Sequence, residues 1–99
     1  KLDQQFDLVW SCEFVEHVYE EYMQNFLQDF ARGTWICMTY APPGFPGHHH
    51  VNCQPAQYWI DAVEQLGYTY SPEDTDAVRA CSTQRKKFVK RRGLVFKKI

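Results

Sequence analysis

The sequence lacks the features that mark membrane, redox and zinc-ribbon proteins. No apolar run approaches the roughly 18 residues of a membrane span, so we expect no membrane partner. The cysteines follow no CxxC spacing, which argues against a redox pair or a zinc ribbon. Disulfides are rare in cytosolic proteins, so we expect these cysteines to be reduced, in a cytoplasmic protein. The four cysteines are Cys12, Cys37, Cys53 and Cys81.

Acidic residues are absent after Asp76. Residues 1–76 contain twelve acidic and two basic residues, a net charge of −10, whereas residues 77–99 contain nine basic residues, a net charge of +9. A basic segment of this kind is compatible with nucleic-acid binding. Apolar residues interleaved with the charges, such as Phe88 and Leu94, favour the alternative of a solvated helix followed by an edge strand protected by lysines.

The residues that are present predict one packed domain. The chain has 99 residues, of which 44% are hydrophobic, enough for a single small core. The nearly continuous apolar run at 6–12 predicts a strand buried on both faces. From Glu13 to about Ala31, apolar residues recur at spacings of three and four, which predicts a helix. Residues 34–40 are β-branched and aromatic and predict a second strand, whereas the Pro- and Gly-rich segment 41–52 predicts a loop.

The second half of the chain continues the alternation of helix and strand. Trp59 and the earlier Trp10 are both expected in the core. The order β-α-β-α-β-α-β predicts an α/β layered domain. The further predicted elements are a helix that starts at Pro55 and ends before Gly67, a strand at 68–70, a helix capped by Ser71 that runs to about Arg91, and a strand at 93–99.

Three segments resemble class I S-adenosylmethionine-dependent methyltransferases. "FDLVWSCEFVEHV" (6–18) is similar to the family's fourth strand and following helix, where an apolar strand that begins with an Asp runs into Ser-x-Glu-x-x-Glu-His. "HVNCQPAQYWIDAVEQLGY" (50–68) is similar to the loop and helix after the fifth strand. "RRGLVFKK" (91–98) is similar to the final strand, which in that fold is antiparallel to its neighbours. The resemblance implies the C-terminal half of a methyltransferase-like fold, a partial Rossmann-like sheet.

The sequence lacks the Gly-rich turn with which that family approaches its cofactor. Five glycines are present, and no two of them form such a turn before a helix. The resemblance therefore implies a fragment with one wall of the S-adenosylmethionine site, inactive on its own. The cofactor-binding residues implied are Ser11, Cys12 and Glu13.

Carboxylates and imidazoles recur in two places that a parallel sheet would bring together. Glu13, Glu16 and His17 stand at i, i+3 and i+4, which places them on one face of a helix. Residues 48–50 are all histidine and follow the neighbouring strand, so both groups would lie at the carboxyl ends of strands. These side chains could hold Mg²⁺, Mn²⁺ or Zn²⁺, with Glu13, Glu16, His17 and His49 as candidate ligands. The alternative is a solvated helix face beside a flexible polar loop.

The resemblance also implies a reaction. Some methyltransferases that resemble this stretch use Glu-x-x-Glu-His and a downstream histidine to hold a metal over a pair of substrate hydroxyls. It therefore implies O-methyl transfer to a small-molecule or RNA hydroxyl, with His17 and His50 as the catalytic residues. The alternative is a non-catalytic α/β protein-association module derived from a methyltransferase.

The strand at 6–12 predicts self-association. The resemblance implies that one of its edges would be bare, because the matching strand of the family is central and flanked by a strand that this chain lacks. The strand carries no lysine or proline to protect that edge. A symmetric homodimer in which two copies cover each other's open side is therefore expected.

Overall fold

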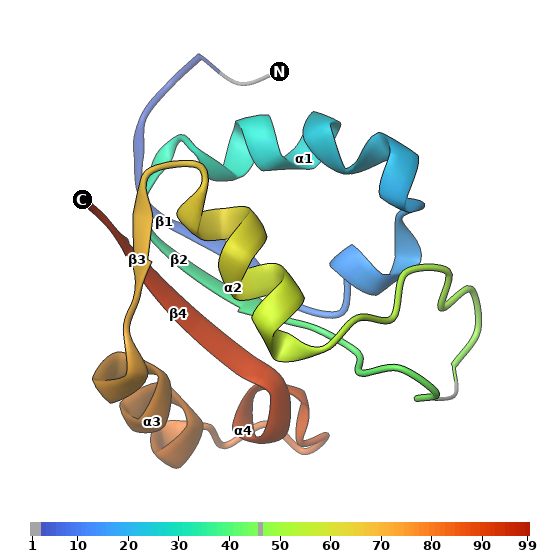
Figure 1. The fold of residues 1–99 in the computed structure, drawn as a ribbon. Coiled ribbons are helices and arrows are strands. Elements are labelled where there is room, and N and C mark those ends of the chain that lie inside the picture. The colour runs from blue at the N-terminus through green and yellow to red at the C-terminus, as the bar shows by residue number, and fades with distance from the viewer. Residues whose placement is uncertain (1–2, 46) are drawn as a thin grey trace.

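The computed structural model describes residues 3–45 and 47–99, which form a four-stranded mixed sheet covered by helices (Figure 1). This arrangement confirms the α/β class. None of the helices in these two ranges has the length and apolar character that a membrane span requires. The strands are β1 (Phe6–Ser11), β2 (Gly33–Thr39), β3 (Tyr68–Tyr70) and β4 (Gly93–Lys98). The helices are α1 (Met23–Phe30), α2 (Ala56–Glu64), α3 (Pro72–Cys81) and α4 (Phe88–Arg92), and two 3₁₀ turns are η1 (Val15–His17) and η2 (Glu20–Tyr22).

The sheet order is β1-β2-β4-β3. β1 runs parallel to β2, with Leu8 opposite Trp35, and β4 is antiparallel to both β2 and β3. The prediction that the final strand is antiparallel to its neighbours is therefore confirmed. The prediction of a lysine-protected edge strand is wrong, because β4 lies inside the sheet. Residues 93–96 are all buried, as a strand with neighbours on both sides and helices on both faces requires.

One face of the sheet carries the core, which is covered by α1 and α2 (Figure 1). The rings of Phe26 in α1 and Trp59 in α2 lie 6.4 Å apart, and Trp59 is fully buried, as predicted. Tyr68 closes the other end of this core, where its hydroxyl donates to the Phe30 carbonyl at 3.0 Å. Each large side chain buried here contributes about 1.5–3 kcal/mol. The sheet residues of this core are Ile36, Met38, Tyr68, Leu94 and Phe96.

The opposite face is only partly covered. α3 lies over β4, where the Thr75 hydroxyl accepts the Val95 N–H at 2.9 Å. β1 lies at the far edge, and Leu8 and Trp10 remain 53% and 52% exposed. The predictions that 6–12 is buried on both faces and that Trp10 lies in the core are therefore wrong. An apolar run predicts a strand, but it does not show whether other elements cover both faces of that strand.

The predicted helix from Glu13 to Ala31 is also wrong in its first half. Regular α-helix begins at Met23, and the chain before it consists of η1, an extended link at Val18 and Tyr19, and η2. The physical reason is competition for the Glu16 carbonyl, which accepts N–H groups from a distant loop in place of the N–H four residues on. The apolar stripe is therefore interrupted: Val15, Phe26 and Phe30 are buried, whereas Tyr19 and Tyr22 are each 53% exposed.

The predicted helix from Ser71 to Arg91 is two helices. Ser71 is the N-cap, as predicted, since its hydroxyl oxygen accepts the Asp74 N–H at 3.2 Å. α3 ends at Cys81 because Ser82 is extended, with φ −64° and ψ 128°, and α4 forms separately. The basic segment is therefore a short helix with a polar linker before it.

All four cysteines are free thiols. Burial, together with the nearby Cys12, raises the pKa of Cys37 to about 11. The Cys37 thiol is therefore protonated at neutral pH and acts as a small core residue, since the thiolate is the reactive form.

Candidate metal site

Two loops leave the sheet side by side at one end of the parallel pair. β1 ends at Ser11 and continues into the β1 loop, residues 12–19, whereas β2 ends at Thr39 and continues into the β2 loop, residues 40–55. Because the two strands are parallel, both loops start from the same edge of the sheet, where α/β proteins bind ligands.

Backbone hydrogen bonds join the two loops. The N–H groups of Val51 and Asn52 both donate to the Glu16 carbonyl oxygen, at 2.9 and 3.1 Å. The Gln54 N–H donates to the Ala41 carbonyl at 3.1 Å, which closes the β2 loop on itself. The loop that carries the three histidines is thereby fixed against the turn that carries the two glutamates.

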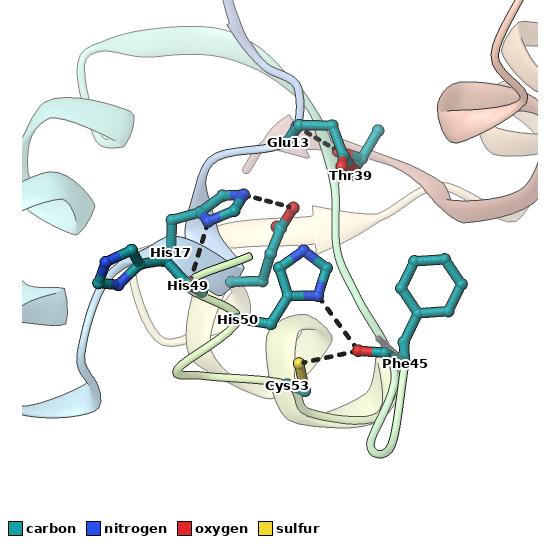
Figure 2. Close-up of polar contacts among 8 residues, drawn as sticks. Glu13, His17, Thr39, Phe45, His49, His50 and Cys53 are labelled. Atoms are coloured by element: carbon teal, nitrogen blue, oxygen red, sulfur yellow. Dashed lines mark hydrogen bonds and ion pairs between the residues drawn. The ribbon is translucent and has the colours of Figure 1, made fainter. Parts of the chain in front are cut away.

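Glu13 has a backbone conformation that is unfavourable for a residue with a Cβ. Its φ is 55°, in the left-handed region, and such strain costs on the order of 1–3 kcal/mol. Its N–H donates to the Thr39 hydroxyl oxygen at 2.8 Å, which ties the β1 loop to the end of β2 (Figure 2). Burial raises the pKa of the Glu13 carboxyl, and the neighbouring Glu16 carboxylate raises it further. The strained backbone of Glu13 therefore directs its carboxyl group toward that of Glu16.

Glu16 is the most unusual side chain of the site. It is fully buried, yet within the described chain neither carboxyl oxygen has a hydrogen-bond partner. The Nε2 atom of His17 lies 3.7 Å from Glu16 Oε2, which is longer than a hydrogen bond. Removing a carboxylate from water is costly unless it is paired or coordinates a cation. The burial of Glu16 therefore points to a positively charged ligand.

Two imidazoles face this carboxylate pair in a fixed orientation. His17 Nδ1 lies 3.0 Å from the His49 carbonyl oxygen, and His50 Nδ1 lies 3.2 Å from the Phe45 carbonyl oxygen (Figure 2). A carbonyl only accepts, so in both rings Nδ1 carries a proton, and in the neutral form of the ring Nε2 presents a lone pair. Metal-binding histidines are typically oriented by a hydrogen bond of this kind from the other ring nitrogen.

The four side chains converge on one point. Ligand atoms of Glu13, Glu16, His17 and His50 all lie within 4.8 Å of one another. Two carboxylates supply up to two negative charges, and two neutral imidazoles complete a donor set suited to Mg²⁺, Mn²⁺, Fe²⁺ or Zn²⁺. The chemistry of the residues present therefore fits a divalent cation.

The structure brings together most of the residues that the sequence indicated. Glu13, Glu16 and His17 converge as expected, but through a strained residue and a 3₁₀ turn, so the shared helix face is not the reason. His50 is the loop histidine of the cluster. His49 is not one of the four, and its contribution is the carbonyl that orients His17. Its ring instead lies 4.8 Å from that of His48.

Three residues that support the cluster were not predicted from the sequence. Thr39 holds Glu13 through its hydroxyl, and Phe45 holds His50 through its carbonyl. Gly47 leaves room for the imidazole, because a Cβ there would lie 2.3 Å from His50 Cε1. Gly47 directly precedes the three histidines, and it was the one feature of the sequence that could have indicated a tightly packed imidazole.

The remaining predicted residues lie at the end of β1. Ser11 is buried, and its hydroxyl has no hydrogen-bond partner within the described chain. Cys12 is half-buried and lies 3.9 Å from the amide nitrogen of Gln84. Both residues directly precede Glu13 in the sequence, and neither belongs to the group of four metal-ligating side chains.

Comparison of the chain with protein-family models, with curated proteins and with solved structures found no match.

Proposed function

We propose that this chain is the acceptor-binding half of a metal-assisted O-methyltransferase. The observation that carries the proposal is the buried Glu16 carboxylate, which has no hydrogen-bond partner in the described part of the chain and belongs to a group of four metal-ligating side chains. The resemblance of residues 6–18 to S-adenosylmethionine-dependent methyltransferases supports methyl transfer as the reaction. A cation supports oxygen as the acceptor atom, because hydroxyl groups need activation before they attack.

Each member of the cluster has a role in this proposal. Glu13, Glu16 and His17 come from one short segment and would hold the cation. Three protein ligands leave coordination positions open for the acceptor oxygen, as catalytic metal sites require. A bound Mg²⁺, Mn²⁺ or Zn²⁺ would lower the pKa of the acceptor hydroxyl. His50 takes the hydroxyl proton on Nε2, since its Nδ1–H is held by the Phe45 carbonyl.

Binding of Mn²⁺ tests the proposal directly. Electron paramagnetic resonance of free Mn²⁺ is expected to show one ion bound per chain, because the cluster forms one site. Glu16→Gln is expected to weaken this binding at least about tenfold, through loss of a charged ligand. Glu21→Gln is the matched control, since Glu21 is an exposed glutamate in the neighbouring turn. Equal loss of binding in both variants, or no binding to the parent chain, would contradict the proposal.

The cofactor side of the site is incomplete in this chain. Ser11 and Cys12 supply one wall for S-adenosylmethionine, and the sequence offers no Gly-rich turn for the rest. The isolated chain is therefore expected to bind S-adenosylmethionine only weakly. Calorimetric titration measures this, and a dissociation constant in the low micromolar range would show that the 99 residues form a complete cofactor site.

A second candidate function rests on a different observation. The uncovered apolar face at Leu8 and Trp10 supports a protein-association module derived from a methyltransferase. Such a module has no use for a cation, so one bound Mn²⁺ that depends on Glu16 favours the enzyme over the module.

A further inference from the structure

A second cavity opens beside the metal cluster and shares Glu13 with it. Its volume of about 100 Å³ is roughly three times the share of one liquid water, which is space for a small tetrahedral anion. The cavity lies between the β2 loop and α4. Its lining residues are Glu13, Tyr40, Phe45, Lys87, Phe88, Arg91 and Arg92.

The charged side chains that line this cavity are mostly cationic. Lys87, Arg91 and Arg92 contribute three positive charges against the single carboxyl of Glu13. The Nε–H of Arg92 is buried and has no hydrogen-bond partner within the described residues. A buried guanidinium donor without an acceptor is costly, in the same way as the Glu16 carboxylate. The buried Arg92 Nε–H therefore points to an anionic acceptor, just as the buried Glu16 carboxylate points to a cation.

The positive charge is not neutralised by the protein itself. Residues 77–99 contain no acidic residue, and the two ion pairs found in 3–45 and 47–99 involve Arg32 and His17, not α4. Lys87 and Arg91 are exposed and available to a ligand. Arginine forks match phosphate oxygens better than any other side chain does.

Phe45 sets the geometry between the two sites. The Arg92 guanidinium carbon lies 5.1 Å from the centroid of the Phe45 ring, and the His50 ring is stacked 6.0 Å from the same centroid. The guanidinium and the imidazole are therefore separated by at most the sum of these two distances. One phosphorylated sugar can span that separation, with its phosphate at Arg92 and a hydroxyl at His50.

We propose that this cavity binds a phosphate group of the methyl acceptor and that the acceptor is a phosphorylated hydroxyl compound. This inference rests on the proposed function, because the hydroxyl is placed at the metal cluster. The phosphate can belong to a mononucleotide or sugar phosphate or to an oligonucleotide, since the chemistry that the cavity recognises is the same.

Phosphate binding is measured with metal removed by a chelator, so that it does not depend on the cation site. The probes are adenosine monophosphate and a short single-stranded oligonucleotide, followed by NMR chemical shifts. Lys87→Gln and Arg91→Gln are each expected to weaken binding of the monophosphate about tenfold, through loss of a charge-assisted contact. Lys86→Gln is the matched control, because Lys86 is an exposed lysine beside Lys87 that does not line the cavity. Glu13→Gln is expected to strengthen binding several-fold, because it removes the only negative charge from the cavity wall.

Two results would overturn the inference. One is no binding of the monophosphate to the parent chain. The other is that Lys86→Gln and Lys87→Gln weaken binding of the probe equally. Equal weakening would indicate attraction to the overall positive charge of the segment, and this holds for the nucleotide and for the oligonucleotide. Tighter binding of the oligonucleotide with the same dependence on Lys87 would assign the phosphate to a nucleic-acid acceptor. Mn²⁺ binding without phosphate binding leaves the proposed function standing, whereas phosphate binding without Mn²⁺ binding contradicts the proposed function and retains the cavity.

Discussion

Glu16→Gln is expected to raise the melting temperature of the metal-free protein and to abolish the further rise that Mn²⁺ produces in the parent chain. The first effect follows from burial, because a neutral amide is cheaper to remove from water than a carboxylate that has no hydrogen-bond partner among residues 3–45 and 47–99. The gain in the free energy of unfolding is expected to be on the order of 1–3 kcal/mol. If Glu16 served only to stabilise the fold, Glu16→Gln would instead lower the free energy of unfolding.

The second effect follows from mass action, since a cation that binds only the native state stabilises it. At a Mn²⁺ concentration one hundred times the dissociation constant, the parent chain gains about 2.7 kcal/mol, on the order of 10–20 °C for a domain of this size. His17→Ala should also remove the metal-induced rise. Differential scanning fluorimetry with and without Mn²⁺ measures both effects.

Glu21→Gln is the control for both effects, because it removes an exposed carboxylate two residues before α1. It should change the free energy of unfolding by no more than about 0.5 kcal/mol and leave the Mn²⁺ effect intact. A Glu16→Gln protein that melts lower without metal, and still gains stability with Mn²⁺, would assign Glu16 to the fold.

Sedimentation velocity is expected to give twice the 11.7 kDa chain mass at micromolar concentration. β1 has β2 on one side and no strand of the described chain on the other. Its exposed face carries Leu8 and Trp10, both more than half exposed. An unpaired edge with apolar side chains is a template for another strand, and two-fold association is the commonest closed assembly. We therefore propose that two copies pair through β1.

Leu8→Lys should weaken the dimer about 10–100-fold, because it replaces a side chain whose burial contributes about 1.5–3 kcal/mol with a charge. Ile99→Lys is the matched control, since Ile99 is 89% exposed and lies outside β1. A well-folded monomer at high micromolar concentration would refute the dimer. Equal weakening by the two variants would place the interface elsewhere.

The parts of the fold that the sequence predicted are those governed by local rules. Ser71 caps α3 because its hydroxyl acts on the N–H three residues later, which is visible in the sequence. The apolar side of α2 and the short β3 follow from spacing and composition in the same way. The antiparallel direction of β4 came from resemblance to a family, since nothing within 93–99 sets its direction.

The errors concern contacts between distant residues. The helix expected from Glu13 fails because the Glu16 carbonyl is taken by residues 51 and 52, more than thirty positions away. The choice between His49 and His50 depends on which residue adopts a positive φ, and that is His49, with φ 57°. Periodicity carries no information inside a loop, so the sequence could place the three histidines near the glutamates and could not say which imidazole would reach them.

Two of the hydrogen bonds that join the two loops involve main-chain groups only, because the N–H groups of Val51 and Asn52 both donate to the Glu16 carbonyl. Every residue except proline offers an N–H, so such a joint tolerates most substitutions on either side. The tip of the β2 loop, at 42–45 and 47–49, can therefore diverge in sequence without displacing the carboxylates, provided that Gly47 still leaves room for the His50 ring. A lineage could exchange one acceptor molecule for another by altering that tip alone, while the cation-binding turn is inherited unchanged.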